Sequence, residues 1–104
     1  FWNGRQIVPR DWVSASVTTD EPHLLASETS PGYGYQWWVP GGGEGDFLAI
    51  GIYGQAIYVS PHHNIVIAKT SAYRGYEQDG EEMELECIAF MRAIAAALGE
   101  TTLP

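Results

Sequence analysis

The clearest periodicity in the 104-residue sequence lies near its C-terminal end. Apolar side chains recur there at spacings of three and four, which is the pattern of an amphipathic helix that buries one face. The stripe comprises Met83, Cys87, Ile88, Met91, Ile94, Ala95 and Leu98. We predict a helix over residues 80–99, with Gly99 as its C-terminal stop.

Four runs of β-favouring side chains lie between residues 33 and 71, at 33–39, 47–53, 56–59 and 65–68. Their connections are short, whereas parallel neighbours need a crossover of about a dozen residues. The runs therefore predict an antiparallel meander of about four strands. Residues 65–68 are apolar throughout, which indicates a strand that is covered on both faces.

Residues 1–32 carry a weaker pattern. A short helix is expected around residues 7–13, with Pro9 in its first turn, and Ile7, Trp12 and Val13 would attach it to the core. Residues 18–32 are polar and lack a period, which is typical of a surface loop. The whole chain is therefore expected to form a single α+β unit, a sheet of residues 33–71 packed against the long helix of residues 80–99.

Composition removes several function classes. The 13 acidic and five basic residues give a net charge of −8, which argues against nucleic acid or anionic lipid as a partner. No run of 18 apolar residues exists, so no membrane span is predicted. The single cysteine excludes an internal disulfide and a cysteine-based zinc site. The acids near the start of the long helix indicate a solvated helix start, with calcium or a basic partner as alternatives; they are Glu77, Asp79, Glu81, Glu82, Glu84 and Glu86.

Complete catalytic signatures are absent from the sequence. There is no Gly-x-Ser-x-Gly elbow, P-loop, His-Glu-x-x-His or dinucleotide fingerprint, so we predict neither a cofactor nor a metal site. We interpret His62 and His63 as part of a solvated turn, because adjacent side chains there diverge and no third ligand is near in sequence. Cys87 is interpreted as a small buried hydrophobic residue.

An aromatic group admits two interpretations. On one strand, Tyr33, Tyr35 and Trp37 would share a face and Trp38 would lie on the other. These rings could pack in the core. They could instead form a platform for a sugar or peptide, and a non-enzymatic binding module is therefore the alternative function.

Three segments resemble the C-terminal end of the serine β-lactamase-like hydrolases, which include class C β-lactamases, penicillin-binding proteins, esterases and 6-aminohexanoate-dimer hydrolase. Segment 3–13 reads NGRQIVPRDWV, segment 33–38 reads YGYQWW, and segment 47–61 reads FLAIGIYGQAIYVSP, followed by the strand-like run at 65–71. The family commonly has Asp where this chain has Ser60. The resemblance implies that the chain is part of an α/β/α sandwich.

The resemblance also implies roles for four residues. In that superfamily a Lys-Thr-Gly box lines the active site, and the residue after its glycine donates a backbone N–H to the oxyanion hole. Residues 49–51, Ala-Ile-Gly, match the box, so the donor would be the Ile52 N–H. Gly51 would let the acyl group lie against the strand, and Tyr53 and Gln55 would border the cleft. Without the Lys and Thr that hold a β-lactam carboxylate, a small-molecule ester or amide is the expected substrate.

A second, partial match and a missing nucleophile complete the comparison. Lys69-Thr70-Ser71 resembles the box itself, but Ser71 replaces its glycine, and we interpret it as an ordinary strand end. Lys69 is the only lysine and Val66 stands three residues before it, so the Ser-x-x-Lys nucleophile of the superfamily is absent. We expect this chain, which starts at Phe1, to be an inactive piece of a longer acyl-serine hydrolase that associates with copies of itself through an uncovered sheet face.

Overall fold

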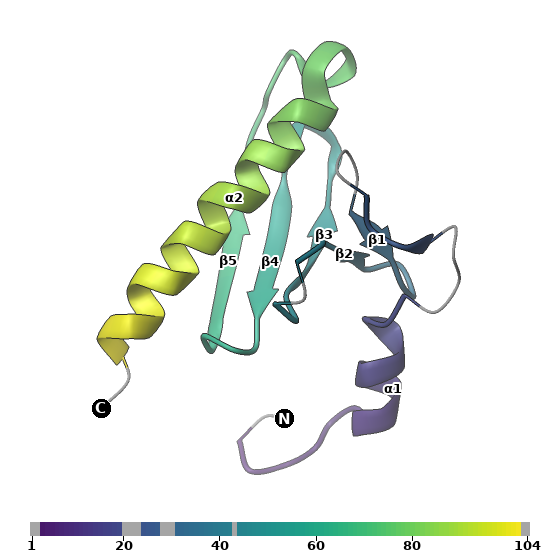
Figure 1. The fold of residues 1–104 in the computed structure, drawn as a ribbon, viewed down its shortest axis with the longest axis vertical. Coiled ribbons are helices and arrows are strands. Elements are labelled where there is room, and N and C mark those ends of the chain that lie inside the picture. The colour runs from purple at the N-terminus through teal and green to yellow at the C-terminus, as the bar shows by residue number, and fades with distance from the viewer. Residues whose placement is uncertain (1–2, 20–23, 28–30, 43, 103–104) are drawn as a thin grey trace.

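The computed structural model describes residues 3–19, 24–27, 31–42 and 44–102. A sheet of five strands has the order β1-β2-β3-β4-β5, and each strand is antiparallel to the next. The elements in chain order are α1 (Arg10–Ser16), β1 (Gly32–Tyr33), β2 (Trp38–Val39), β3 (Phe47–Ile50), the 3-10 turn η2 (Ile52–Gly54), β4 (Ala56–Ser60), β5 (Ile65–Lys69) and α2 (Tyr76–Thr102). The long helix α2 lies across one face of the sheet (Figure 1). The expected α+β fold, an antiparallel meander with a C-terminal helix, is confirmed.

The fifth strand comes from the aromatic run at residues 33–39. A single strand was predicted there, and this prediction is wrong because the chain reverses within the run. The Gly34 N–H donates to the Trp37 carbonyl at 2.8 Å, and Gln36 adopts a φ of 66°. Tyr33 of β1 and Trp38 of β2 therefore lie opposite each other as a cross-strand pair.

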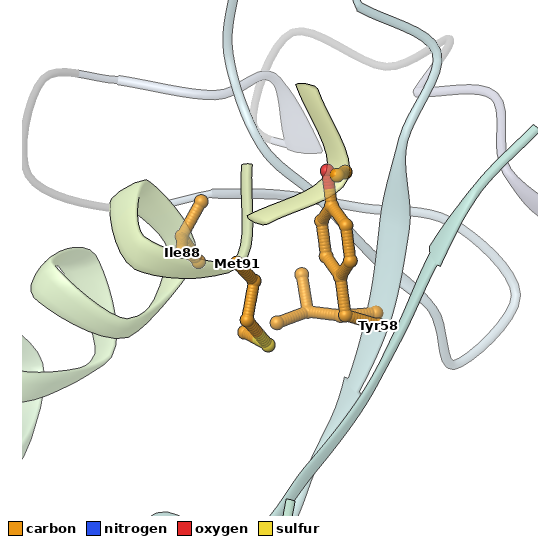
Figure 2. Packing of buried hydrophobic residues seen from close by; sticks show 5 residues of the cluster. Tyr58, Ile88 and Met91 are labelled. Atoms are coloured by element: carbon orange, nitrogen blue, oxygen red, sulfur yellow. The ribbon is translucent and has the colours of Figure 1, made fainter. Parts of the chain in front are cut away.

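The hydrophobic core lies between the sheet and α2. Leu48 of β3 pairs with Tyr58 of β4, and both belong to one buried cluster with Ile88 and Met91 of α2. Figure 2 shows Tyr58, Ile88 and Met91 in this cluster. Ala95, one turn further along α2, is fully buried. The helical stripe read from the sequence is thus confirmed in its central part, whereas Leu98 at its end is exposed.

The other face of the sheet is apolar, and no described helix covers it, although the Trp37 ring packs against Phe47 at its edge. Two cross-strand rows form it, Phe47, Val59 and Val66 in one and Ala49, Ile57 and Ala68 in the other. Val66 is 67% exposed and Ile57 is 48% exposed, so the prediction that β5 is covered on both faces is wrong for this chain. The chain exposes 7605 Å², whereas a compact monomer of its size would expose about 5,800 Å².

The N-terminal helix α1 does not join the core. Trp12 is 58% exposed, and Ile7 and Val13 are exposed as well, so the predicted attachment of these three side chains is wrong. Trp12 instead contacts the exposed ring of Tyr35, with 5.2 Å between ring centroids. Within the described residues, no helix has both the length and the apolar character needed to cross a membrane.

Helix α2 extends further in both directions than its apolar stripe indicated. It begins at Tyr76 and continues through Gly99 to Thr102, so the prediction that Gly99 ends the helix is wrong. The glycine has another role, which is to allow close packing against the turn between β4 and β5. A Cβ added at Gly99 would lie 2.6 Å from His63 Nδ1 and 3.2 Å from His63 Cβ.

This contact predicts the sign of a double-mutant cycle. In the variant His63→Gly, which removes both the imidazole and the Cβ, the further change Gly99→Ala should stabilise the chain by up to about 1 kcal/mol, because alanine favours helix over glycine by that amount. In the wild-type background the same change should destabilise, since overpacking typically costs about 1–3 kcal/mol. Urea unfolding of the four chains measures the coupling. Equal effects of Gly99→Ala in the two backgrounds would contradict the packing role.

Candidate functional site

The segment that the sequence singled out forms a kinked turn between β3 and β4. The Gly51 N–H donates to the Gln55 carbonyl at 2.7 Å, which closes the turn. Tyr53 (φ 62°) and Gly54 (φ 83°) are both left-handed, a conformation that is uncommon for a tyrosine. A Cβ at Gly54 would lie 2.8 Å from Met83 Cε, so a glycine lets the turn approach α2 closely.

The Ile52 N–H lies at the first position of this turn. The first N–H groups of a helical turn have no acceptor inside the turn. Among the described residues outside the turn, no backbone carbonyl accepts a hydrogen bond from it. The residue as a whole, including its apolar side chain, is 53% exposed.

Gln55 and Tyr53 frame the turn in different ways. The Gln55 side-chain amide Nε2 donates to the Ile52 carbonyl at 3.3 Å, which holds the turn from inside. The Tyr53 carbonyl accepts from the Tyr73 N–H at 3.0 Å, and the Tyr53 ring lies edge-on to Tyr76 with centroids 6.2 Å apart. The side chains of Tyr53 and Gln55 are both exposed at this turn.

A shallow hollow of about 460 Å³ adjoins the turn. Gly51 and Gln55 line it, so the structure brings these two predicted residues to one cavity. Its other lining residues are Ala49, Ile50, Ala56, Ile57, Ala68, Lys69 and Thr70. No acidic residue lines it, and small apolar side chains make up most of the lining.

Lys69, the only cation at this hollow, is turned toward the helix. Its Nζ donates to Cys87 Sγ at 2.9 Å and lies 3.8 Å from Met83 Sδ. Cys87 is half-buried on the face of α2 that meets the sheet. The sequence did not indicate this pair, because the two residues are 18 positions apart and only the placement of α2 on β5 brings them together.

A buried ionic network, also unforeseen from the sequence, links the loop before β3 to α2. Arg92 binds Asp46 through two hydrogen bonds, Nε to Oδ2 at 2.6 Å and Nη2 to Oδ1 at 2.8 Å. Nη2 also donates to the Gly41 carbonyl at 2.7 Å, and Glu44 lies 2.6 Å from Nε. The Tyr58 hydroxyl donates to Asp46 Oδ2 at 2.6 Å. Asp46 is only 1% exposed, so these contacts hold a carboxylate inside the fold.

The network sets the protonation states of its members. Burial by itself would raise the pKa of Asp46, but the hydrogen bonds from Arg92 and Tyr58 and the charge of Arg92 outweigh it and lower the pKa below its usual value. Burial and the bond to the Asp46 carboxylate raise the pKa of Tyr58, which stays a neutral donor. The hydrogen bond to Asp46 raises the pKa of Arg92. The arrangement is therefore a permanent ion pair at neutral pH.

The aromatic residues do not share a face as the single-strand interpretation required. Tyr33 packs edge-on against Trp38 at 4.6 Å, and Trp37 packs edge-on against Phe47 at 5.2 Å. Tyr35 lies apart from them, on Trp12 of α1. The predicted alternation is wrong because the run folds back on itself as β1 and β2.

Side chains that bind metals do not gather anywhere in the described part of the chain. No group of three or more His, Cys, Asp or Glu residues there could hold a metal ion. His62 and His63 lie edge-on to each other, 4.8 Å between centroids, in the turn after β4.

Comparison with known proteins supports the hydrolase resemblance in coarse terms. No protein-family model matches the sequence. The chain is 32% identical over 77 residues to a 6-aminohexanoate-dimer hydrolase of Paenarthrobacter ureafaciens. This match covers 67% of the chain and 19% of that enzyme, so the chain spans about a fifth of the length of the curated relative it matches.

Proposed function

We propose that this chain is the C-terminal part of a serine hydrolase and supplies one wall of its acyl-binding site. The observation that carries the proposal is the Ile52 N–H, a backbone donor left without a partner among the described residues at an exposed turn. The similarity to a hydrolase over 77 residues supports it. The substrate is a small ester or amide.

The proposed chemistry is acyl transfer through an acyl-serine intermediate. A serine outside this chain attacks the substrate carbonyl, and the carbonyl oxygen gains negative charge in the tetrahedral intermediate. The Ile52 N–H donates to that oxygen as one half of the oxyanion hole. A preorganised donor of this kind typically contributes about 3 kcal/mol of transition-state stabilisation. The closed Gly51–Gln55 turn supports such preorganisation, because it holds the donor without using its N–H.

The hollow beside the turn supports a neutral substrate. Gly51 has no side chain, so an acyl group can lie against the strand end. Gln55 lines the hollow there, whereas Ile52 and Tyr53 lie beyond its lining, further along the turn. Ala49 and Ile50 offer no charge to a substrate carboxylate, and the Lys69 ammonium is directed at Cys87. The acyl portion is therefore uncharged where it contacts this wall.

The exposed apolar face of the sheet supports the proposal that this chain is part of a longer hydrolase. An apolar face formed by Phe47, Ile57, Val66 and their neighbours would be buried by the rest of the hydrolase. In the isolated chain the same face favours association with further copies, and sedimentation at several concentrations tests that hypothesis.

A serine-directed fluorophosphonate probe tests the proposal. The hydrolase that contains this chain should be labelled on one serine outside residues 1–104. The isolated chain should give neither labelling nor an acyl-ester burst, although it contains serines of its own, because none precedes a lysine by three positions. Heat-denatured hydrolase serves as the control for non-specific labelling. Labelling within residues 1–104, or an unlabelled but active hydrolase, would refute the acyl-serine mechanism.

A further inference from the structure

The only lysine and the only cysteine of the chain meet where the sheet joins the long helix. Lys69 is the last residue of β5, and Cys87 lies on α2, which crosses in front of that strand (Figure 1). Lys69 Nζ and Cys87 Sγ are 2.9 Å apart, and Met83 Sδ lies 3.3 Å from Sγ. Two groups that each occur once in 104 residues are thus held in direct contact by tertiary structure.

The chemistry of an oxidised thiol gives this contact a consequence. A cysteine oxidised to sulfenic acid condenses with a thiol, or with a backbone nitrogen to form a sulfenamide. A deprotonated lysine amine is a stronger nucleophile than a backbone amide and can form the same type of bond. No second thiol exists in the chain, so an internal disulfide cannot form. The nitrogen held nearest to the sulfur by a side-chain contact is the lysine amine. Neither residue is fully buried, so a small oxidant can reach the pair.

We propose that Lys69 and Cys87 form a peroxide-dependent modification site, at which the lysine captures the oxidised cysteine as a covalent S–N cross-link. In the first step hydrogen peroxide oxidises the thiol: an S–O bond forms, the O–O bond breaks, and water leaves. In the second step Lys69 Nζ, having released a proton to solvent, attacks Sγ. The S–N bond forms, the S–O bond breaks, and the hydroxyl leaves as water with a second proton from nitrogen. The sum is one thiol, one ammonium and one peroxide giving one sulfenamide, two waters and one proton.

The fold makes capture faster than further oxidation. Holding two reacting groups in contact turns a bimolecular step into a unimolecular one, with a large gain in effective concentration. The product is a covalent link between the end of β5 and α2. Without it, the backbone between Lys69 and Cys87 is their only covalent connection. A thiol reductant reverses the cross-link, whereas sulfinic acid is not restored by it.

Intact-mass spectrometry of the 104-residue chain, titrated with hydrogen peroxide, tests the proposal. Circular dichroism first establishes that the chain and its variants have the same helix content. The wild-type chain should lose two hydrogen atoms in mass at Cys87 and Lys69, and dithiothreitol should restore them. Peptide fragmentation separates this change from oxygen that peroxide adds to Met83 and Met91. After digestion with trypsin, which no longer cleaves at the modified Lys69, residues 11–74 should remain joined to residues 75–92.

The variant Lys69→Arg is the matched control, because it keeps the charge but lacks a nucleophilic amine. It should gain two or three oxygen atoms on Cys87 instead, as should the wild-type chain in concentrated urea. Folded wild-type chain that gains oxygen atoms on Cys87 at the same rate as Lys69→Arg, with no joined peptides, would overturn the proposal. Joined peptides whose mass includes one additional oxygen atom would show that the cross-link is not a direct S–N bond.

Discussion

Replacing Ile52 by proline in the hydrolase that contains this chain should lower kcat by about 100- to 1000-fold, the loss expected when one oxyanion donor is removed. Proline has no N–H, so the change removes the donor, together with the exposed isoleucine side chain. The fold should accept it for two reasons. Gly51 is already extended (φ −111°, ψ 165°), as a residue before proline must be, and Ile52 opens a helical turn, where proline is favoured.

Steady-state kinetics with an ester substrate measures this effect, and kcat and kcat/KM should fall together because the interaction exists only in the transition state. Ile52→Val keeps the N–H and should stay within a few-fold of wild type. An Ile52→Pro enzyme with unchanged kcat would show that another group stabilises the oxyanion. A rise in KM alone would place the residue in substrate binding.

Replacing Arg92 by methionine should lower the free energy of unfolding by about 3–5 kcal/mol, the usual cost of removing one partner of a buried ion pair. Asp46 would then keep its charge inside the fold with only the Tyr58 hydroxyl as a side-chain partner. Because domains are stable by only about 5–15 kcal/mol, much of the chain's stability would be lost. Urea unfolding at neutral pH measures the change. The control is Glu44→Gln: this carboxylate is 53% exposed, so its loss should cost at most about 1 kcal/mol.

The pH dependence of the free energy of unfolding distinguishes two roles of Arg92, an ion pair with Asp46 and packing of its methylene groups. In the wild-type chain the lowered pKa of Asp46 contributes stability above the unfolded pKa of about 3.9, and that contribution is lost as the pH falls through the folded pKa. In Arg92→Met, burial should dominate and raise the pKa of Asp46, so acid protonates and relieves the buried carboxylate. The stability difference between the two chains should therefore narrow as the pH falls. A difference that is constant with pH would mean that Arg92 acts mainly through its methylene groups.

The sequence was most informative where the structure depends on residues close together along the chain. The apolar stripe predicted α2, and the short apolar runs predicted β3, β4 and β5 to within a few residues, because side-chain alternation and helical spacing are local properties. The run at residues 47–53 continues past the end of β3, because Ile52 and Tyr53 have strand-favouring side chains but lie in the 3-10 turn. The left-handed Tyr53 was not expected, because tyrosine gives no signal for that conformation.

The sequence-based predictions were wrong where a residue type is compatible with two local structures. The run at residues 33–39 has strand-forming side chains throughout, yet Gly34 and Gln36 allow a reversal, and pairing Tyr33 with Trp38 gains a cross-strand contact. Gly99 has the sequence signature of a helix stop, but it lies inside α2, where it gives room for His63. Both outcomes depend on partners that local spacing does not reveal.

By itself, the sequence determined the α+β class and the order of β3, β4, β5 and α2 along the chain. Only the tertiary structure decided which faces are covered and which polar groups meet. Asp46 and Arg92 are 46 positions apart, and Lys69 and Cys87 are 18 apart. Each pair forms because α2 crosses the sheet in one particular placement. That placement follows from the packing of Leu48 and Tyr58 against Met91, which is a property of the assembled core.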